Sequence, residues 1–386
     1  MVHQLLRLPH SRRLQALVVV SVAATLILPI QLPILTRPEP KPSPAPVVQI
    51  GTSYSPSRAQ YLGLDWQKSY DRLLDMHFKV IRLSAYWSEA DGQGYDRLDW
   101  LMQRSQQAGQ PIVLSVGMKG LGWPEYYIPN EYQPVSASDG GDVSQDPAVK
   151  AGALVFVQQT VLRYQENPML VAWQVENEPM NPAGPHRWWI DPKFVAQEVT
   201  AVKQLDGTRP VIVNAFGSFN MLFDRLSNRN GIDLTKLLGF ESNTAEHQSL
   251  QSIGKGDILG LDIYTRIGYT WLGQDKVADA DSGWATTAGH WRNQALKQSK
   301  QAWITEAQAE PWETTPKTLA DPKSTLAPDI VKRFDKLQAQ GFSTILLWGA
   351  EYWLWRDLNA DPSWLDSVQT LLARNVSAPS LLNSTV

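Results

Sequence analysis

The chain has 386 residues and contains no cysteine. Disulfide bonds, thiolate metal ligands and a cysteine nucleophile are therefore excluded. The charge is nearly balanced, with 35 Lys and Arg against 38 Asp and Glu, and no basic run follows the amino-terminal arginines. Because nothing in this balance would attract a polyanion, we predict no nucleic-acid partner.

Several short catalytic motifs are also missing. The six histidines show no H-E-x-x-H or comparable ligand spacing, so we predict neither a metal nor another cofactor. G-x-S-x-G is absent, which argues against an esterase of the α/β-hydrolase type. Residues 51–58 (GTSYSPSR) lack the glycine-rich turn that follows the first strand of a dinucleotide-binding fold.

The amino terminus carries a long apolar run. Arg7, Arg12 and Arg13 precede an uncharged stretch at residues 14–36, which is long enough to cross a bilayer core of about 30 Å. We expect residues 1–36 to be a signal-anchor that holds an exported protein at the cell membrane, since the arginines favour a cytoplasmic amino terminus. The alternative is a cleaved signal peptide and a secreted protein. Residues 37–46 contain five prolines and predict a stiff linker.

From residue 47 onward, short β-type apolar runs alternate with amphipathic stretches, a pattern typical of parallel strands covered by helices. Eight strands are predicted, at residues 47–53, 79–86, 111–117, 169–177, 210–216, 257–264, 302–307 and 343–349. The predicted helices include residues 65–77, 146–165, 191–205 and 327–340. We therefore predict the α/β fold class, as a single (β/α)8 TIM barrel with long βα loops at residues 47–376, followed by a tail at 377–386.

Two points leave the architecture open. The fifth helix is hard to place between residues 218 and 256. A doubly wound sheet is the rival fold, although the missing glycine-rich turn argues against it.

Two glutamates lie where predicted strands end. Asn177 and Glu178 end the fourth strand, and Glu306 ends the seventh. In a barrel, the carboxyl ends of the strands carry the active site. Glycosidic bond cleavage requires two carboxyl groups, and a separation of about 5–5.5 Å between them predicts retention of configuration. Glu176 lies two residues before Glu178 and is the main competitor for a catalytic role, but we expect it deeper in the barrel.

With these strand-end residues in this order, the chain resembles the clan A glycoside hydrolases, in particular the family 5 cellulases and mannanases. The resemblance implies that Glu178 is the acid/base and Glu306 the nucleophile. It also implies that Arg82 keeps the nucleophile ionised and oriented. An ion pair with a purely structural role is the alternative for Arg82.

The same resemblance assigns roles in the substrate-binding site to three further residues. Asn177 would bind the sugar 2-hydroxyl, Tyr264 would donate to the nucleophile, and Trp348 would floor the subsite of the sugar under attack. Packing at the barrel rim is the alternative for the two aromatic residues. One departure stands out, because this chain has Asp262-Ile-Tyr264 where many family 5 enzymes have His-x-Tyr.

The 16 tryptophans are a high number for this length, and several fall in predicted loops. Indole rings stack on the C–H faces of sugars, so we expect Trp87, Trp123 and Trp312 to contact substrate. The prediction is a monomeric, retaining β-glycoside hydrolase acting on an oligo- or polysaccharide such as a β-glucan, cellulose or β-mannan. A non-catalytic glycan-binding barrel and a transglycosylase with the same two glutamates are the alternatives.

Overall fold

The computed structural model describes residues 48–92, 94–135, 137–216, 244–280, 282–313 and 319–376. The predicted membrane segment at 1–36, the linker at 37–46 and the tail at 377–386 lie outside the described residues. Within the described ranges, no helix is both long and apolar enough to cross a membrane.

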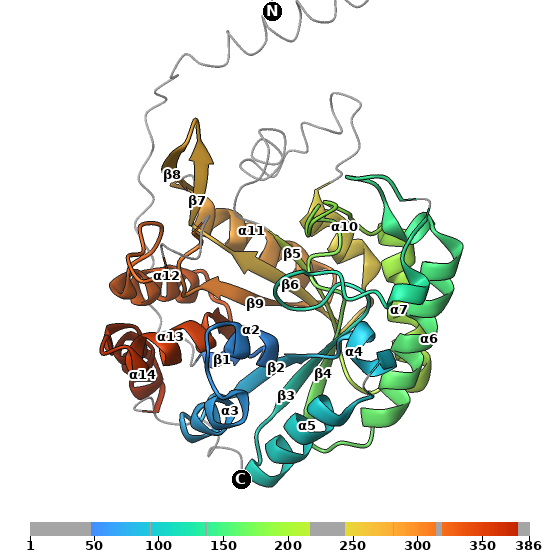
Figure 1. Ribbon diagram of the computed structural model, residues 1–386, viewed down its shortest axis with the longest axis horizontal. Helices are drawn as coiled ribbons and strands as arrows, with labels where there is room; N and C mark the ends of the chain where they lie inside the picture. Colours follow the sequence, from blue (N-terminus) through green and yellow to red (C-terminus); the bar gives the residue numbers. More distant parts are fainter. Residues whose placement is uncertain are drawn as a thin grey trace, which may run out of the picture. The chain divides into compact units, whose positions relative to one another are not determined.

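The core of the fold is a closed barrel of parallel strands (Figure 1). Its strands are β1 (Gln49–Ser53), β2 (Val80–Ser84), β3 (Ile112–Val116), β4 (Leu170–Val175), β5 (Val211–Phe216), β6 (Ile258–Ile263), β9 (Gln301–Gln308) and β10 (Thr344–Trp348). Each strand pairs in parallel with its neighbours, and β1 closes the barrel against β10. The eight strands predicted from the sequence and the TIM-barrel architecture are confirmed.

Helices surround the barrel. They are α2 (Pro56–Tyr61), α3 (Trp66–Asp75), α4 (Trp87–Gly92), α5 (Asp96–Ala108), α6 (Pro147–Tyr164), α7 (Pro192–Leu205), α10 (Ala245–Ser252), α11 (Trp284–Lys297), α12 (Ala327–Ala339), α13 (Ala350–Leu358) and α14 (Ser363–Val376). Local chemistry sets their ends, since Asp146 and Asp191 cap the first turns of α6 and α7 and a proline follows each cap. The short helix α10 lies in the stretch where the fifth helix was hard to place, and residues 217–243 are outside the described part.

Two segments after barrel strands add to this plan. An antiparallel hairpin of β7 (Arg266–Trp271) and β8 (Gln274–Asp279) follows β6. Two short 3-10 turns, η2 (Asn130–Tyr132) and η3 (Val143–Gln145), lie in the connection from β3 to α6. The sequence analysis predicts long βα loops but misses the hairpin.

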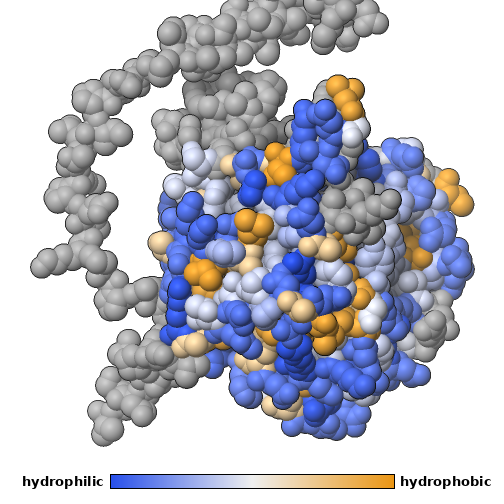
Figure 2. Space-filling model, turned by 60° about the vertical axis from the view of Figure 1, so that its left-hand side comes forward, coloured by the Kyte–Doolittle hydropathy of each residue, from blue (hydrophilic) through white to orange (hydrophobic). Residues whose placement is uncertain are grey.

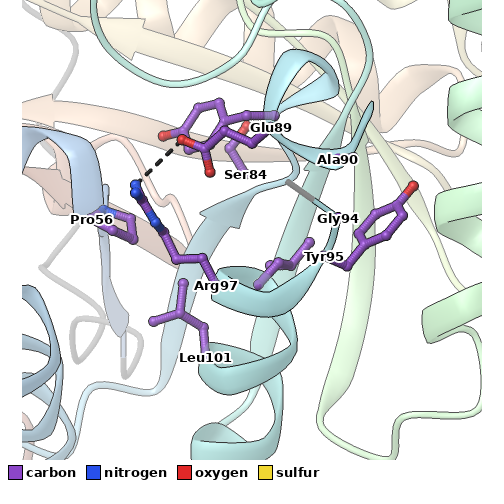
Figure 3. Close-up of a pocket in the computed structure, with 10 residues that line it drawn as sticks. Pro56, Ser84, Glu89, Ala90, Gly94, Tyr95, Arg97 and Leu101 are labelled. Atoms are coloured by element: carbon purple, nitrogen blue, oxygen red, sulfur yellow. Dashed lines mark hydrogen bonds and ion pairs between the residues drawn. The ribbon is translucent and has the colours of Figure 1, made fainter. Parts of the chain in front are cut away.

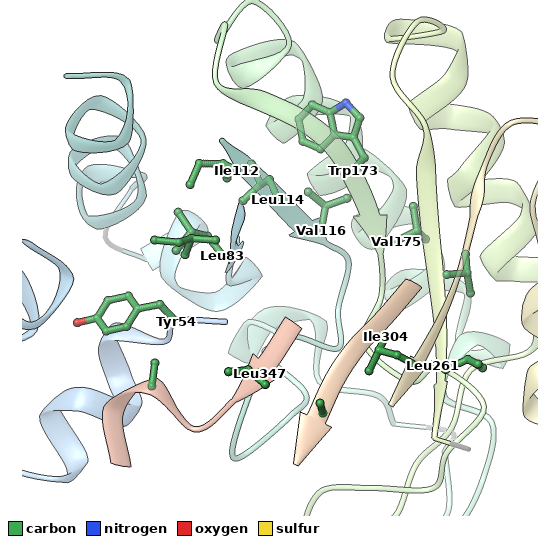
Figure 4. Packing of buried hydrophobic residues seen from close by; sticks show 14 of the residues in the cluster. Tyr54, Leu83, Ile112, Leu114, Val116, Trp173, Val175, Leu261, Ile304 and Leu347 are labelled. Atoms are coloured by element: carbon green, nitrogen blue, oxygen red, sulfur yellow. The ribbon is translucent and has the colours of Figure 1, made fainter. Parts of the chain in front are cut away.

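The main apolar core lies between the strands and the surrounding helices, and Figure 4 shows part of it. Leu83, Ile112, Trp173, Ile304 and Leu347 are at most 1% exposed. Burying one such side chain stabilises the fold by about 1.5–3 kcal/mol. This layer fixes the helices on the outside of the barrel and leaves the strand ends free to carry polar residues.

A second, smaller cluster takes one apolar residue from each of six strands: Val80, Val113, Ala172, Ile212, Ile258 and Leu346. Side chains two positions apart on a strand face the same side. The polar residues two positions further on therefore form the next layer toward the carboxyl ends of the strands: Arg82, Ser115, Gln174 and Asn214. Glu178 and Glu306, the catalytic candidates, contact residues of this polar layer.

One face of the molecule is shown in Figure 2, where hydrophobic side chains form separate patches among hydrophilic ones. Scattered patches of this kind are normal on a protein surface. The monomeric state expected from the sequence stays a prediction.

Candidate active site

Three acidic side chains meet at the carboxyl end of the barrel. One carboxylate oxygen from each of Glu178, Asp262 and Glu306 lies within 4.8 Å of the other two. We call these residues the acidic trio. Each is at most 6% exposed. The structure thus brings together the two glutamates predicted from the sequence and adds an aspartate between them.

A register shift in β9 turns Glu306 toward this site. Ile304 pairs with Leu261 of β6, whereas Glu306 pairs with Asp262, so two steps along β9 match one step along β6. Such a bulge re-aims the side chains that follow it. Thr305 and Glu306 both reach Asp262 or its neighbours as a result, which strict alternation along the strand would not allow.

Glu306 is held by two donors. Arg82 Nη2 lies 2.5 Å from its Oε1, and the Tyr264 hydroxyl donates to its Oε2. Arg82 is fully buried, and it also donates to Ser53 Oγ at 2.9 Å and to Gln174 Oε1 at 3.1 Å. A buried guanidinium next to a carboxylate favours the ionised carboxylate. Glu306 is thus a carboxylate whose two oxygens are oriented by a cation and a phenol.

Glu178 has the opposite electrostatic environment. Burial and the nearby charge of Glu306 raise its pKa to about 7, against an ordinary value of 4.5. Lys119 and a 2.8 Å hydrogen bond from Asn181 Nδ2 to Glu178 Oε2 act in the lowering direction. Because burial disfavours the charged form, Glu178 carries a proton at slightly acidic pH while Glu306 faces a cation.

Asn177 is bound through its side-chain oxygen. Its Oδ1 accepts from Asn214 Nδ2 at 2.9 Å and from Gln174 Nε2 at 3.3 Å. Asn214 also donates to Asp262 Oδ2 at 2.5 Å. Burial, followed by the charges of the two glutamates, raises the pKa of Asp262 well above its ordinary value.

The sequence analysis misses Asn214, Gln174 and the role of Asp262 in this network. Asn214 could have been noticed, because it is a polar residue within the apolar run of β5. Asp262 was noticed only as a departure from the family pattern.

Lys119 is a further residue that the sequence analysis does not single out. Its ammonium is fully buried and donates to the backbone oxygens of Glu178 at 2.8 Å and Asn181 at 2.9 Å. It also lies 3.6 Å from Glu125 Oε2. Lys119 therefore ties the segment after β3 to the segment that presents Glu178.

Glu176 is not part of the acidic trio. Its carboxylate accepts from the backbone nitrogens of Met118 at 2.9 Å and Lys119 at 2.6 Å. It lies so close to Gly117 that a Cβ there would be 2.4 Å from its Oε1. It also interacts with Glu198 of α7, and burial raises the pKa of both groups.

The backbone explains this direction. Strand β4 ends at Val175, and both Glu176 and Glu178 have positive φ angles, 57° and 46°. Strand alternation therefore stops before Glu176, and the carboxylate of this competitor for a catalytic role points away from the acidic trio.

Two of the predicted aromatic residues lie beside the acidic trio. The ring of Trp348 is 5.8 Å from Arg82 Cζ, and its Nε1 donates to Glu310 at 3.1 Å. Trp312 is 40% exposed and meets Tyr264 edge-on, with ring centroids 4.8 Å apart. Both rings therefore connect to the residues that hold Glu306.

Trp123 and Trp87 have very different surroundings. Trp123 is 72% exposed, so its ring is free to contact a ligand. Trp87 is 3% exposed and packs against Tyr132 and Phe156, with ring centroids 4.9 and 6.0 Å apart. This burial places Trp87 in the core and does not fit the substrate contact predicted for it.

Three carboxylate oxygens at this spacing are also a donor set for a cation. Protein donors already occupy them, however. Arg82 and Tyr264 bind the two oxygens of Glu306, Asn214 and Thr305 donate to the two oxygens of Asp262, and Asn181 donates to Glu178. Because Arg82 already supplies a positive charge, the arrangement suits proton chemistry better than cation binding.

A separate pocket lies between α2, α4 and α5, as Figure 3 shows. Arg97 Nη1 and Glu89 Oε1 form an ion pair in it at 3.3 Å. The pocket is lined by Pro56, Ser84, Tyr86, Glu89, Ala90, Gly94, Tyr95, Arg97, Leu98 and Leu101. The predicted site residues, all of which are described, are absent from this lining, so the pocket is distinct from the acidic trio.

Comparisons with known proteins agree with this architecture. No protein-family model matches the chain. Over 99 residues, the chain is 31% identical to a probable mannan endo-1,4-beta-mannosidase A-1 from Aspergillus terreus. That match covers 23% of this chain and only 25% of the relative.

Solved structures match over most of the chain. A GH5_18 protein from Streptomyces cattleya in complex with GlcNAc is 14% identical, with a TM-score of 0.55 over 87% of this chain and 82% of that one. A GH5_18 protein from Bifidobacterium longum in complex with Manb1-4GlcNAc is 13% identical, with a TM-score of 0.56 over 86% and 79%. A beta-galactosidase from Rahnella is 13% identical, with a TM-score of 0.53 over 86% of this chain and 57% of that one. At these identities the likeness concerns the fold alone.

Proposed function

We propose that this protein is a retaining β-glycoside hydrolase that works through a covalent glycosyl-enzyme. The observation that carries the proposal is the approach of Glu178 and Glu306, with carboxylate oxygens within 4.8 Å of each other and opposite electrostatic environments. Retaining enzymes hold these groups about 5–5.5 Å apart, whereas inverting enzymes need about 6.5–9.5 Å to admit a water molecule. The short separation therefore favours double displacement.

In the first step, a Glu306 oxygen attacks the anomeric carbon and forms an ester bond to the sugar. The bond from that carbon to the glycosidic oxygen breaks, and Glu178 gives its proton to the leaving oxygen. In the second step, Glu178 takes a proton from water, the water oxygen bonds to the anomeric carbon, and the ester bond to Glu306 breaks. The raised pKa of Glu178, about 7, suits a group that must both give and take a proton.

The surrounding residues fit supporting roles. Arg82 and Tyr264 bind the two oxygens of Glu306 and aim its carboxylate. Asn177 would donate to the sugar 2-hydroxyl, a contact that strengthens in the transition state. Trp348 would lie under the sugar that is attacked, while Trp312 and Trp123 would stack on sugars at either side.

The proposed substrate is a β-linked glycan of the glucan or mannan type. The name of the Aspergillus relative and the bound Manb1-4GlcNAc of the Bifidobacterium structure both favour mannose-containing substrates. The match spans only a quarter of the length of that curated relative, so the substrate is proposed separately from the mechanism. We also propose, from the sequence alone, that residues 14–36 direct export and attach the protein to the membrane.

The test uses aryl β-glycosides and a panel of β-linked polysaccharides. Wild-type protein should release product with retained configuration. Glu306→Ala should be inactive and should regain turnover with azide, giving a glycosyl azide of inverted configuration. Glu178→Ala should give a retained azide from substrates with good leaving groups.

The matched control is Glu198→Gln, another buried glutamate, which lies on α7 outside the acidic trio. This variant should keep wild-type activity. Full activity in Glu306→Ala would eliminate the proposed nucleophile, and an inverted product from the wild type would eliminate the mechanism.

A further inference from the structure

The amide of Asn177 has only one orientation that satisfies its neighbours. Asn214 Oδ1 accepts from the backbone nitrogen of Glu178 at 2.7 Å. A backbone N–H can only donate, so the oxygen of Asn214 must face Glu178. The amino group of Asn214 must then face the opposite way, toward Asn177 Oδ1 at 2.9 Å and Asp262 Oδ2 at 2.5 Å.

The orientation of Gln174 fixes the Asn177 amide in the same way. Its Oε1 accepts from Arg82 Nη1 at 3.1 Å, and a guanidinium has no acceptor. Its amino group is therefore turned toward Asn177 Oδ1, at 3.3 Å, and the backbone oxygen of Glu176, at 2.9 Å. Two amino groups thus converge on the side-chain oxygen of Asn177.

The remaining amino group of Asn177 must point away from this network. Turning the amide over would place Asn177 Nδ2 against the amino groups of Asn214 and Gln174 and remove the acceptor that these two groups share. A buried polar group left without its partner costs about 1–3 kcal/mol, and Asn177 is only 6% exposed. The network therefore presents an N–H donor, and never a carbonyl acceptor, to whatever lies beside Asn177.

From this geometry we infer that Asn214 and Gln174 are positioning residues that lock the Asn177 amide as a donor, with Asp262 holding Asn214, so that the site selects sugars with an acceptor oxygen at position 2. The inference rests on the proposed function and specifies its substrate class. Sugars with a hydroxyl at position 2 satisfy it. Sugars with a protonated amino group there offer only donors and should be rejected, as should 2-deoxy sugars.

Asp262 contributes to this network as a hydrogen-bond acceptor. Its two oxygens accept from Asn214 Nδ2 and from Thr305 Oγ1, each at 2.5 Å. An asparagine at this position can still accept from Asn214 with its oxygen and donate to the Thr305 hydroxyl with its amino group. Asp262→Asn is therefore a conservative replacement that preserves the orientation, whereas Asn214→Asp removes the donor that fixes it.

The experiment compares kcat/KM for an aryl β-glycoside and for its 2-deoxy analogue in each protein. The ratio of the two values reports the position-2 contact, and the different intrinsic reactivities of the substrates cancel between proteins. Asn214→Asp should lower this ratio by about tenfold or more, the worth of one hydrogen bond. Asp262→Asn should keep the wild-type ratio.

An unchanged ratio in Asn214→Asp, with both substrates slowed equally, would overturn the inference and leave Asn214 a purely structural role. A lowered ratio in Asp262→Asn would overturn the part assigned to Asp262. If Asn214→Asp does not fold, Asn214→Ser answers the same question, because a hydroxyl can still accept from Glu178 N–H. Failure of the proposed function is distinct, since wild-type protein would then hydrolyse neither substrate.

Discussion

The pH dependence of catalysis should follow the titration of Glu178. Its pKa is raised from 4.5 to about 7, first by burial and then by the charge of Glu306. A difference of about 2.5 pH units corresponds to about 3 kcal/mol in favour of the protonated acid. For a substrate whose leaving group needs that proton, kcat/KM should fall about tenfold per pH unit above pH 7.

Replacing Asn181 by alanine tests this reasoning, because Asn181 Nδ2 donates to Glu178 Oε2 at 2.8 Å and stabilises the ionised form. Without that bond the pKa of Glu178 must rise, and the alkaline limb must move to higher pH. A hydrogen bond to a charged group contributes about 1.5 kcal/mol or more. The shift should therefore approach about one pH unit, less if water replaces the lost donor.

The assay is a pH profile of kcat/KM for an aryl β-glycoside with a poor leaving group, from about pH 4 to 9. Asn293→Ala is a matched control, since Asn293 is exposed on α11. That variant should keep the wild-type profile. An alkaline limb that stays in place or moves to lower pH in Asn181→Ala would refute the assignment of this limb to Glu178.

Two further predictions concern stability. Arg82→Met leaves Glu306 buried without its cation. The free energy of unfolding, measured in urea at neutral pH, should therefore fall by about 3–5 kcal/mol. An unchanged value would mean that the ion pair contributes nothing to stability. Burial raises the pKa of Glu198 and Glu176 in the folded protein, so the unfolded chain binds fewer protons and stability is lost as pH rises above about 4.5. Glu198→Gln removes one of these groups and should raise Tm more at pH 8 than at pH 5, whereas equal gains at both pH values would contradict it.

Much of the fold follows from local sequence patterns. All eight barrel strands appear where apolar runs predict them, and the four helices named from the sequence agree with the structure within two residues at each end. Asp-Pro pairs begin α6 and α7 because the carboxylate caps the first free N–H groups and proline fits the first turn. The hairpin of β7 and β8 was missed because β8 has no apolar run: its sequence is QDKVAD, and the strand is largely exposed.

Part of the candidate site could likewise be predicted from the sequence, and part could not. Glu178 and Glu306 could be selected from the sequence, because parallel strands in a closed barrel present their carboxyl ends at one rim. The direction of Glu176 could not, because it depends on positive φ angles after β4 and on a contact with Glu198 of another element. The burial of Trp87 depends likewise on Tyr132 and Phe156, which come from other parts of the chain.

The sequence by itself determined where the barrel strands lie and which polar residues follow them, since both depend on neighbours along the chain. Only the tertiary structure decided which of these residues bond to one another. Asn214 meets Asp262 across 48 positions of sequence, and Gln174 meets Arg82 across 92. Contacts of this kind depend on the order and register of the strands in the closed barrel, because shifting a strand by one residue turns every side chain to the opposite face.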